Sequence, residues 1–464
     1  MTASRRGRPA RRVHKVARRF RKSELGGLAG DSGYMAVTQG SYVGSDLVQI
    51  ALITHALGLA EFGRFSLVVA FVSLVSALLN VKVSIAATTF GARHLRRDPR
   101  AAAGVFQLSY LVDLSTGVLF VIAVGLLSLL IGSGIVGGVG ITVVLLYTLV
   151  PLAKNLDNTP LVILRLRDRF KLVAAVTFAT ELLRLAFVVA ALAVDKSLFA
   201  VVVGLVVGRL VASAVKAVLA FRVFGKDFPG VKLRRPALRH LPPDERQAMR
   251  RTILKSSAIS LDHVSQVHVP TLLLGAFVGA TGTGLYKIGM ALAAVVSKVA
   301  DPASAALLPR LSRLWAEERF DDLRRLVKQA TLITLPIIAV VFLVIVLIRD
   351  PLLELLGGGE EATAAGTILI LGAAGQAAYA AVFWRGTVLH AAHRTGAVAA
   401  VSMIGAALQI AAAYVLIRVM GAEGAALAFL LSRLFINGSL SVLAVRVMNR
   451  AGRGTTPPLV TPHA

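Results

Sequence analysis

Twelve long apolar segments constrain what this chain can fold into more than any other feature of its sequence. An α-helix needs about 20 consecutive, mostly apolar residues to cross the hydrocarbon core of a bilayer. Such spans are expected near residues 33–59, 65–90, 103–132, 138–164, 172–194, 198–221, 254–279, 284–308, 327–349, 363–388, 396–419 and 424–445. The sequence therefore predicts an all-α polytopic membrane protein with about twelve transmembrane helices.

The composition agrees with this fold class. Mean hydropathy is +0.75, and only 16% of the residues are charged, against about 25% in soluble domains. The net charge is nevertheless +27, so the charges should gather in the loops. No segment outside the apolar spans is long enough to fold as a nucleic-acid-binding domain, and no nucleic acid partner is expected. Cysteine is absent, which excludes disulfides and cysteine-ligated metals, and we expect neither a metal nor a cofactor.

Basic residues alternate between the loops and orient the predicted bundle. Ten Lys and Arg residues precede residue 23, and further basic clusters lie at residues 93–100, 165–171 and 310–325. The intervening loops carry little positive charge. Because cytoplasmic loops hold the excess of Lys and Arg, both termini are expected in the cytoplasm, with the chain in a bacterial inner membrane. The basic tail is expected to contact anionic lipids there.

A longer basic segment divides the spans into two sets of six. Six is even, so both sets enter the membrane in the same sense, as parallel repeats do. We therefore expect two six-helix lobes related by a parallel pseudo-repeat. The predicted organisation is a basic cytoplasmic tail, an N-lobe, a basic cytoplasmic linker, a C-lobe and a cytoplasmic tail, at residues 1–32, 33–222, 223–253, 254–446 and 447–464.

The first turn of each half carries the same glycine pattern. Residues 58–65 and 279–286 both show Gly, four residues, Gly, one residue and an aromatic side chain. Glycine suits a tight turn because it reaches positive φ at little cost. Any tight turn collects glycine, but the two copies occupy the same place in their halves, which favours a repeat.

Polar residues form stripes on spans one, two, seven and eight. Asp46 lies beside a serine-containing face of span one, and Asn80 lies within such a face of span two. Lys82 points away from that face. Asp262 and His263 belong to span seven, the most polar of the twelve. Two interpretations are open for these stripes: cavity lining, or hydrogen bonds between packed helices.

The residues of span eight are the strongest indication of a cavity. Lys287, Ala291, Ala294, Lys298 and Asp301 share one helical face. Small residues with lysines pack poorly in a closed core but suit the wall of a water-filled cavity. A charge at the bilayer centre costs about 2.5–3.5 kcal/mol on insertion scales. We therefore expect Lys298 and Asp301, and also Asp262 on span seven, to face a cavity. For Lys287, snorkelling to the outer interface is an alternative.

Other charges within the spans read as structural. Glu181 and Arg184 are neighbours three residues apart on a helix and are expected to neutralise each other. Arg209 and Lys216 have no acidic neighbour nearby in the sequence. Asp157 lies in a polar segment bounded by prolines, where a kink is expected.

Several segments together resemble the polysaccharide (Wzx-type) flippases of the multidrug, oligosaccharidyl-lipid and polysaccharide exporter superfamily. Residues 57–65 look like the turn between the first two helices of these flippases. Residues 284–286 and 307–315, with the run Leu-Leu-Pro-Arg-Leu-Ser-Arg-Leu-Trp, are similar to the eighth helix and its cytoplasmic end. Residues 352–361 resemble the outer loop before helix ten.

The resemblance implies two lobes in a V, with helices one, two, seven and eight lining a central cavity. It implies transport of an oligosaccharide on a polyprenyl pyrophosphate from the cytoplasmic to the outer leaflet, and possible contact with glycan-assembly proteins. Cavity cations would hold the pyrophosphate. The substrate-binding residues that it suggests are Lys298, Lys287, Lys82, His263 and Asn80, and the coupling or cavity acids are Asp46, Asp262 and Asp301. Related chains often carry a charged residue near the end of helix seven. This chain has His268, Val269 and Pro270 at that place.

Three other functions compete with that of a flippase. A cation-coupled drug or small-molecule antiporter of the same superfamily would share the fold. A major facilitator transporter should carry a Gly-x-x-x-Asp-Arg-x-Gly-Arg signature after span two, which residues 91–100 do not match. A sugar polymerase or glycosyltransferase would need a large outer loop or clustered carboxylates, and neither is present. We therefore expect a transporter and not an enzyme.

Overall fold

The computed structural model describes residue 34 and residues 37–79, 83–95, 98–132, 136–228, 246–250, 260–298, 300–392 and 394–451. Helices account for nearly all of these residues, in agreement with the predicted fold class. Asn80 and Lys82 lie outside the described residues, as do the side chains of Asp262 and His263.

The helices of the first half follow one another through short turns. The first helix covers residues 37–57. It is followed by α2 (Leu59–Leu79), α3 (Val83–Leu95), α4 (Pro99–Ile131), α5 (Ile141–Leu156), α6 (Asn158–Leu166), α7 (Phe170–Val194) and α8 (Leu198–Asp227).

The second half repeats the pattern. It contains α10 (Ser260–Phe277), α11 (Ala280–Lys298), α12 (Asp301–Ala316), α13 (Phe320–Leu347), α14 (Arg349–Gly357), the 3₁₀ helix η3 (Glu360–Ala365), α15 (Gly366–Ala381), α16 (Trp384–Ala391) and α17 (Thr395–Ala451). Gly421 interrupts α17 with φ 59° and ψ −133°, which separates the eleventh expected span from the twelfth.

Several spans expected as single helices are built from two. Span four breaks at Asp157, between α5 and α6, where the kink was predicted. Span eight breaks between α11 and α12, and a proline in the first turn of α12 suits that new start. Hydropathy along the sequence does not reveal such breaks, because both parts of a broken span are apolar. Counted one by one, seven helices of the described part are long and apolar enough to cross a membrane.

The outward faces of the long helices are apolar and exposed. On α4, Leu119, Ile122 and Leu126 are each more than half exposed, and Leu332 and Val340 on α13 are similarly uncovered. A soluble protein rarely presents such continuous apolar surface, whereas lipid tails would cover it. The fold is that of a multi-pass membrane protein.

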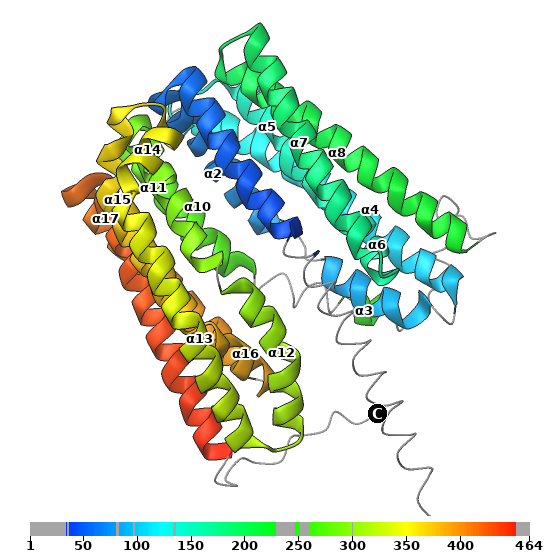
Figure 1. Cartoon of the computed structure of the whole chain (residues 1–464). Coiled ribbons are helices and arrows are strands. Elements are labelled where there is room, and N and C mark those ends of the chain that lie inside the picture. Colours follow the sequence, from blue (N-terminus) through cyan, green and yellow to red (C-terminus); the bar gives the residue numbers. More distant parts are fainter. Residues whose placement is uncertain are drawn as a thin grey trace, which may run out of the picture.

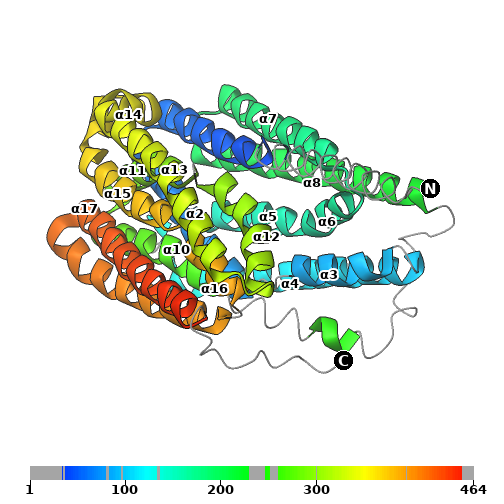
Figure 2. The same ribbon diagram turned by 60° about the horizontal axis from the view of Figure 1, so that its bottom comes forward.

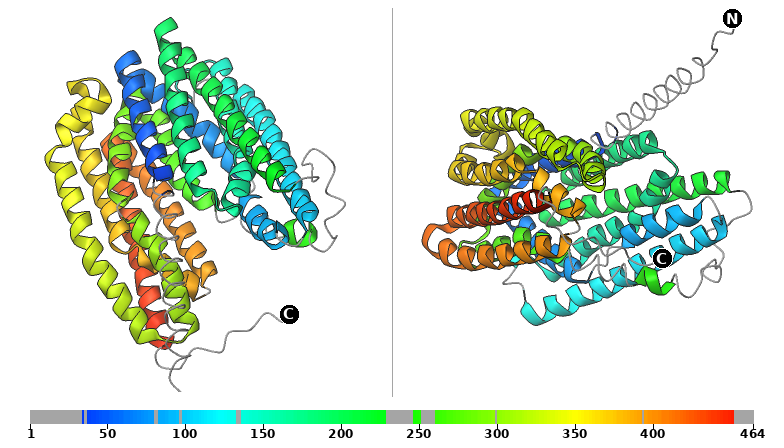
Figure 3. Two further views of the ribbon diagram at one scale, coloured as in Figure 1. Left: turned by 45° about the vertical axis from the view of Figure 1, so that its right-hand side comes forward. Right: turned by 90° about the horizontal axis from the view of Figure 1, so that it is seen from below.

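The helices form two lobes that meet at one end and diverge at the other (Figure 1). The main contacts between the lobes join α2 to α10 and α11. We call the end where these helices and α14 meet the closed end. At the opposite, open end, α3 and α6 belong to one lobe and α12 and α16 to the other (Figures 2 and 3).

Paired glycines let the two lobes touch backbone to backbone at the closed end. A Cβ atom on Gly63 of α2 would overlap the carbonyl oxygen of Ala280 in α11. A Cβ on Gly284 of α11 would lie 2.6 Å from the carbonyl oxygen of Leu59 in α2. Only glycine allows this approach, since a backbone oxygen cannot rotate away as a side chain can.

These contacts are reciprocal in the two repeats. Gly58 and Gly279 adopt φ of 85° and 88°, as expected for the glycine that opens each turn. Ala280 follows Gly279 and is the residue that a Cβ on Gly63 would overlap. Leu59 follows Gly58 and is the residue that a Cβ on Gly284 would approach too closely. The predicted glycine pattern therefore occupies a pseudo-two-fold contact between the lobes.

A methyl group at this contact should hold the closed end apart. We expect Gly63→Ala to disfavour the closed arrangement by about 1–3 kcal/mol, the usual cost of overpacking. The chain has no cysteine, so spin labels can be attached at Lys196→Cys, in the exposed turn between α7 and α8, and at Glu360→Cys, at the exposed start of η3 in the other lobe. Electron–electron distance measurements should show a longer distance once Gly63 is replaced.

Gly44→Ala is the matched control, because nothing lies within 4 Å of a Cβ at that position in the first helix. It should leave the label distance unchanged. An unchanged distance in the Gly63 variant as well would show that the contact does not hold the lobes together.

Candidate functional site

A cavity of about 370 Å³ lies within the C-lobe and collects several predicted site residues. Its walls come from α10, α11, α12, α15 and α17. Lys287, Lys298 and Asp301, which share one face of span eight in the sequence, line it. The other lining residues are Val267, Tyr286, Met290, Ala294, Ser297, Gln376, Tyr379, Phe429 and Arg433.

The periodicity of α11 explains which residues reach this cavity. Lys287, Ala294 and Lys298 follow one face of the helix. Ile288 and Leu292, which fall on the other face, are buried in the hydrophobic core. Lys287 therefore lines the cavity in this structure.

Lys298 is the last residue of α11, and Asp301 is the first of α12. The Lys298 ammonium donates a hydrogen bond to the Asp301 carboxylate at 3.2 Å, and nearly half of each side chain is exposed. Span eight is thus interrupted where the sequence suggested a continuous helix. The pair sits where the chain leaves one helix axis for another, so water can reach both groups.

Arg433 is a cavity cation that the sequence reading did not single out. Its guanidinium lies 4.9 Å from the ring centre of Phe429 and 5.6 Å from that of Tyr379, within the range of cation–π attraction. Arg385 approaches the same Tyr379 ring at 5.1 Å and donates to the carbonyl oxygen of Val382 at 3.0 Å. The sequence signal was a lone arginine inside the twelfth apolar span.

The cavity carries more positive than negative charge. Lys287, Lys298 and Arg433 line it, while Asp301 is the one acid among the described residues of its wall. Asp301 is engaged by Lys298. In the described part of the chain, no ion pair involves Lys287. Charge within a membrane protein needs water or a partner.

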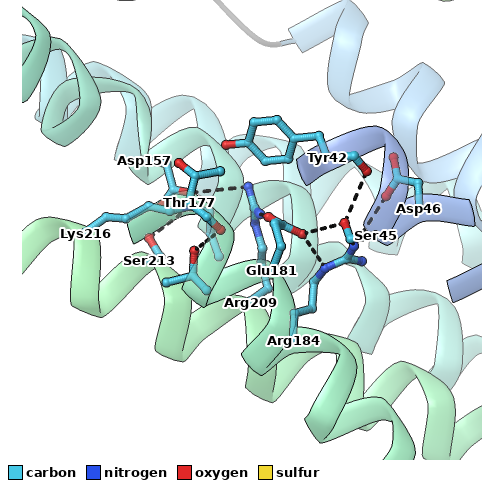
Figure 4. A network of polar contacts seen from close by, with 12 residues as sticks. Tyr42, Ser45, Asp46, Asp157, Thr177, Glu181, Arg184, Arg209, Ser213 and Lys216 are labelled. Atoms are coloured by element: carbon cyan, nitrogen blue, oxygen red, sulfur yellow. Dashed lines mark hydrogen bonds and ion pairs between the residues drawn. The ribbon is translucent and has the colours of Figure 1, made fainter. Parts of the chain in front are cut away.

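The N-lobe also contains a network of charged side chains that neutralise one another (Figure 4). Glu181 binds Arg184 at 2.8 Å and Arg209 at 3.3 Å. Asp157 binds Arg209 at 3.2 Å and Lys216 at 2.8 Å. The predicted Glu181–Arg184 pair is confirmed.

The first helix joins this network through its polar face. Arg184 donates to Ser45 at 2.9 Å and reaches Asp46 at 3.3 Å, and it also donates to Gln49. Ser45 in turn donates to Glu181 at 3.1 Å. The two residues Ser45 and Gln49 therefore serve contact between helices, which was one of the two interpretations. The side chain of Asp46 itself remains 71% exposed.

Three acids and three bases make up the network of Asp46, Asp157, Glu181, Arg184, Arg209 and Lys216. It is balanced without any bound ion. No group of three or more His, Asp or Glu side chains able to hold a metal occurs among the residues that the structure describes.

Removing one buried partner should destabilise the N-lobe. Lys216 is fully buried against Asp157, so Lys216→Met leaves the network with an excess carboxylate. Breaking a buried pair typically costs about 3–5 kcal/mol, and the remaining Arg209 contact should place the loss at the lower end. Thermal unfolding followed by size-exclusion chromatography of the detergent-solubilised protein measures it.

Adding Asp157→Asn to Lys216→Met should recover much of the stability, because it removes the orphaned charge. Lys196→Met, at an exposed lysine between α7 and α8, should change little. Equal melting temperatures for Lys216→Met and Lys196→Met would mean that the buried pair adds no stability.

Comparison with protein families and solved structures places this geometry among known proteins. A family model described as polysaccharide biosynthesis protein matches residues 28–315, more than half of the chain. The MatE family model matches residues 268–415. No curated protein sequence matches the chain.

Three solved structures share the fold at 14% identity. An inward-facing multidrug resistance MATE family transporter of the MOP superfamily aligns with a TM-score of 0.68, covering 89% of this chain and 96% of its own. The lipid II flippase MurJ, in an inward closed conformation, gives 0.62 with 91% and 90% covered. An outward-facing multidrug resistance MATE family transporter of the same superfamily gives 0.58 with 92% and 96% covered. These relatives share the two-lobe, twelve-helix architecture.

Proposed function

The chain belongs to the polysaccharide biosynthesis protein family, and from that membership we propose that it moves an oligosaccharide linked to polyprenyl pyrophosphate across a bacterial inner membrane. The head group would pass from the cytoplasmic to the outer leaflet by alternating access. Both termini would lie in the cytoplasm, where the basic tail would meet anionic lipids, and the transporter would contact glycan-assembly proteins.

The observation that carries this proposal is the division of charge between the lobes. The N-lobe network is balanced by its own residues, whereas the described wall of the C-lobe cavity carries three cations, Lys287, Lys298 and Arg433, and one acid, Asp301. A pyrophosphate would supply the missing negative charge. A cationic drug would meet repulsion in the same cavity, so this charge balance supports the flippase over the drug antiporter.

The shape of the molecule supports a route for such a substrate. The lobes diverge at the end that carries the basic clusters at residues 165–171 and 310–325 (Figure 1). Facing the cytoplasm, this open end would admit the head group while the prenyl chain stays in lipid between the lobes. Rocking of one lobe against the other, which separates the glycine contact, would then expose the head group on the other side.

The direct test is flipping by purified protein in liposomes. A fluorescent oligosaccharide on polyprenyl pyrophosphate should become accessible to an impermeant quencher faster in vesicles that contain the protein than in empty ones. In cells, loss of the protein should leave the lipid-linked oligosaccharide in the inner leaflet and little glycan at the surface. Normal surface glycan without a paralogue would contradict the proposal, and raised drug sensitivity instead would favour the antiporter.

The role of Lys298 can be separated from its pairing with Asp301. Both groups are nearly half exposed, so their ion pair adds little stability. We expect Lys298→Ala to reduce the flipping rate at least 10-fold at normal expression, because a charge-assisted contact to the substrate is lost. Lys298→Ala with Asp301→Ala should not restore the rate.

Arg319 and Asp322 provide a control pair at the same sequence spacing. Their side chains are exposed and 2.7 Å apart, with Arg319 just before α13 and Asp322 in its first turn. Replacing both with alanine should leave flipping unchanged. Full recovery in the Lys298 and Asp301 double variant would show that the pair is structural.

A further inference from the structure

Arg418 is an exposed arginine near the closed end that no acid of the described chain neutralises. It lies three residues before Gly421, where α17 bends. The bend packs beside the end of α10, since a Cβ on Gly421 would lie 4.0 Å from Val278. Within the described residues, Arg418 contacts two aromatic rings and makes no ion pair or hydrogen bond, not even with Glu423 just beyond the bend. It also lies outside the wall of the C-lobe cavity.

The face of α17 that ends at Arg418 is otherwise apolar and exposed. Ile404, Leu408 and Val415 are all uncovered, and Ala411 between them is exposed as well. These positions follow one another at spacings of four, three and four residues, and Arg418 continues the series. Such a spacing keeps all of them on one side of a helix. In a membrane this side would face lipid tails, with the guanidinium at its end.

The length of this stretch places Arg418 near a surface of the bilayer. Thr395 begins α17 at the open end, next to α16. The helix from Thr395 to Arg418 spans about 35 Å. The hydrocarbon core is about 30 Å thick, so the two residues fall near opposite interfaces. Arg418 therefore lies at the level of lipid head groups, in the leaflet at the closed end.

Two aromatic rings hold the guanidinium in a corner. Its carbon lies 4.1 Å from the ring centre of Tyr414, one turn earlier on α17, and 4.7 Å from that of Phe277, the last residue of α10. The two rings meet at 75°, with their centres 5.7 Å apart. Cation–π attraction orients a guanidinium, but it leaves the planar fork of N–H donors available to an acceptor. The Tyr414 hydroxyl makes no hydrogen bond to a described residue either.

We propose that Arg418, Tyr414 and Phe277 form a binding site for the phosphate of a phospholipid in the leaflet at the closed end. The guanidinium would donate two parallel N–H bonds to phosphate oxygens, and the Tyr414 hydroxyl would donate a third. The acyl chains would follow the apolar face below, which a free phosphate would leave uncovered. The site does not depend on the proposed function, which only assigns the leaflet as the outer one. It is separate from the basic tail expected at the cytoplasmic face.

This site would connect the lipid head groups to the contact between the lobes. Phe277 ends α10, and α10 packs against α2 of the N-lobe. The turn that follows Phe277 contains Gly279 and leads to Ala280, the residue that Gly63 touches. A phosphate bound to Arg418 would therefore hold this end of the C-lobe at the depth of the head groups, while the N-lobe moves against it.

Quenching of a local fluorophore tests the site in the purified full-length protein. The chain has no cysteine, so one dye can be attached at Ala411→Cys, on the exposed face about 10 Å deeper than Arg418. In phosphate-free maltoside detergent, the protein is titrated with phosphatidylglycerol or with diacylglycerol, each carrying a nitroxide in mid-chain. Phosphatidylglycerol should quench the dye at a concentration at least 10-fold lower than diacylglycerol, because only the former has a phosphate.

Substitutions at the site should remove this preference in steps. Arg418→Gln should weaken the apparent affinity for phosphatidylglycerol about 10-fold, as expected for loss of a charged hydrogen bond, and leave diacylglycerol unchanged. Arg418→Lys keeps the charge but loses the fork, so its affinity should fall between those of Arg418→Gln and the unmodified protein. Tyr414→Phe keeps the ring and loses the hydroxyl, and it should weaken binding about 3-fold.

Arg349 provides the matched control. It begins α14, also at the closed end of the C-lobe, but it already binds Asp350 at 3.1 Å. Arg349→Gln should change the affinity for phosphatidylglycerol less than about 2-fold. Equal weakening in the Arg349 and Arg418 variants would overturn the site, because attraction to any positive charge would then explain the binding.

Three further results would also overturn the proposal. Equal quenching by the two lipids in the unmodified protein would show that the phosphate is not recognised. Unchanged affinity in an Arg418→Gln variant that elutes as folded protein would mean that Arg418 only joins α10 to α17. Displacement of phosphatidylglycerol by an equal concentration of inorganic phosphate would identify the ligand as a free anion and not a lipid.

Discussion

The free-energy cost of placing charge in the hydrocarbon core of a membrane limits where this chain can hold charged side chains. The two lobes compensate for that cost in different ways. In the N-lobe, Asp157 and Glu181 bind three bases brought from α7 and α8, so the interior closes on itself. In the C-lobe, lysine and arginine surround a cavity with a single described acid, which is already paired. An excess of charge of one sign within a membrane requires water, a ligand or a further partner. The first lobe is therefore suited to act as a rigid wall and the second to carry the ligand.

Much of this could be predicted from the sequence because the relevant signals are local. The apolar spans, the glycine turns and the shared face of Lys287, Lys298 and Asp301 all depend on spacing within one segment. The Glu181–Arg184 pair was predictable for the same reason. Helical periodicity places such residues together whatever the remainder of the chain does.

What could not be predicted depends on contacts between distant segments. The partner of Lys216 is 59 residues away, and Arg433 lies against Tyr379 of another helix. The break after Lys298 leaves the hydropathy of span eight unchanged, although the proline that follows was a visible signal. The positions of Asn80, Lys82, Asp262 and His263 as substrate or cavity residues stay predictions, since those residues or their side chains lie outside the described ranges.

The reciprocal glycine contact has an evolutionary reading. Gly63 touches the start of α11 as Gly284 touches the start of α2, so one surface patch meets its own copy. Such self-matching contact is the hallmark of an isologous two-fold dimer. Each half has an even number of spans and could enter the membrane in one orientation. A six-helix ancestor could thus have paired through this patch, and tandem duplication of its gene would have fused an existing homodimer into one chain without any new interface.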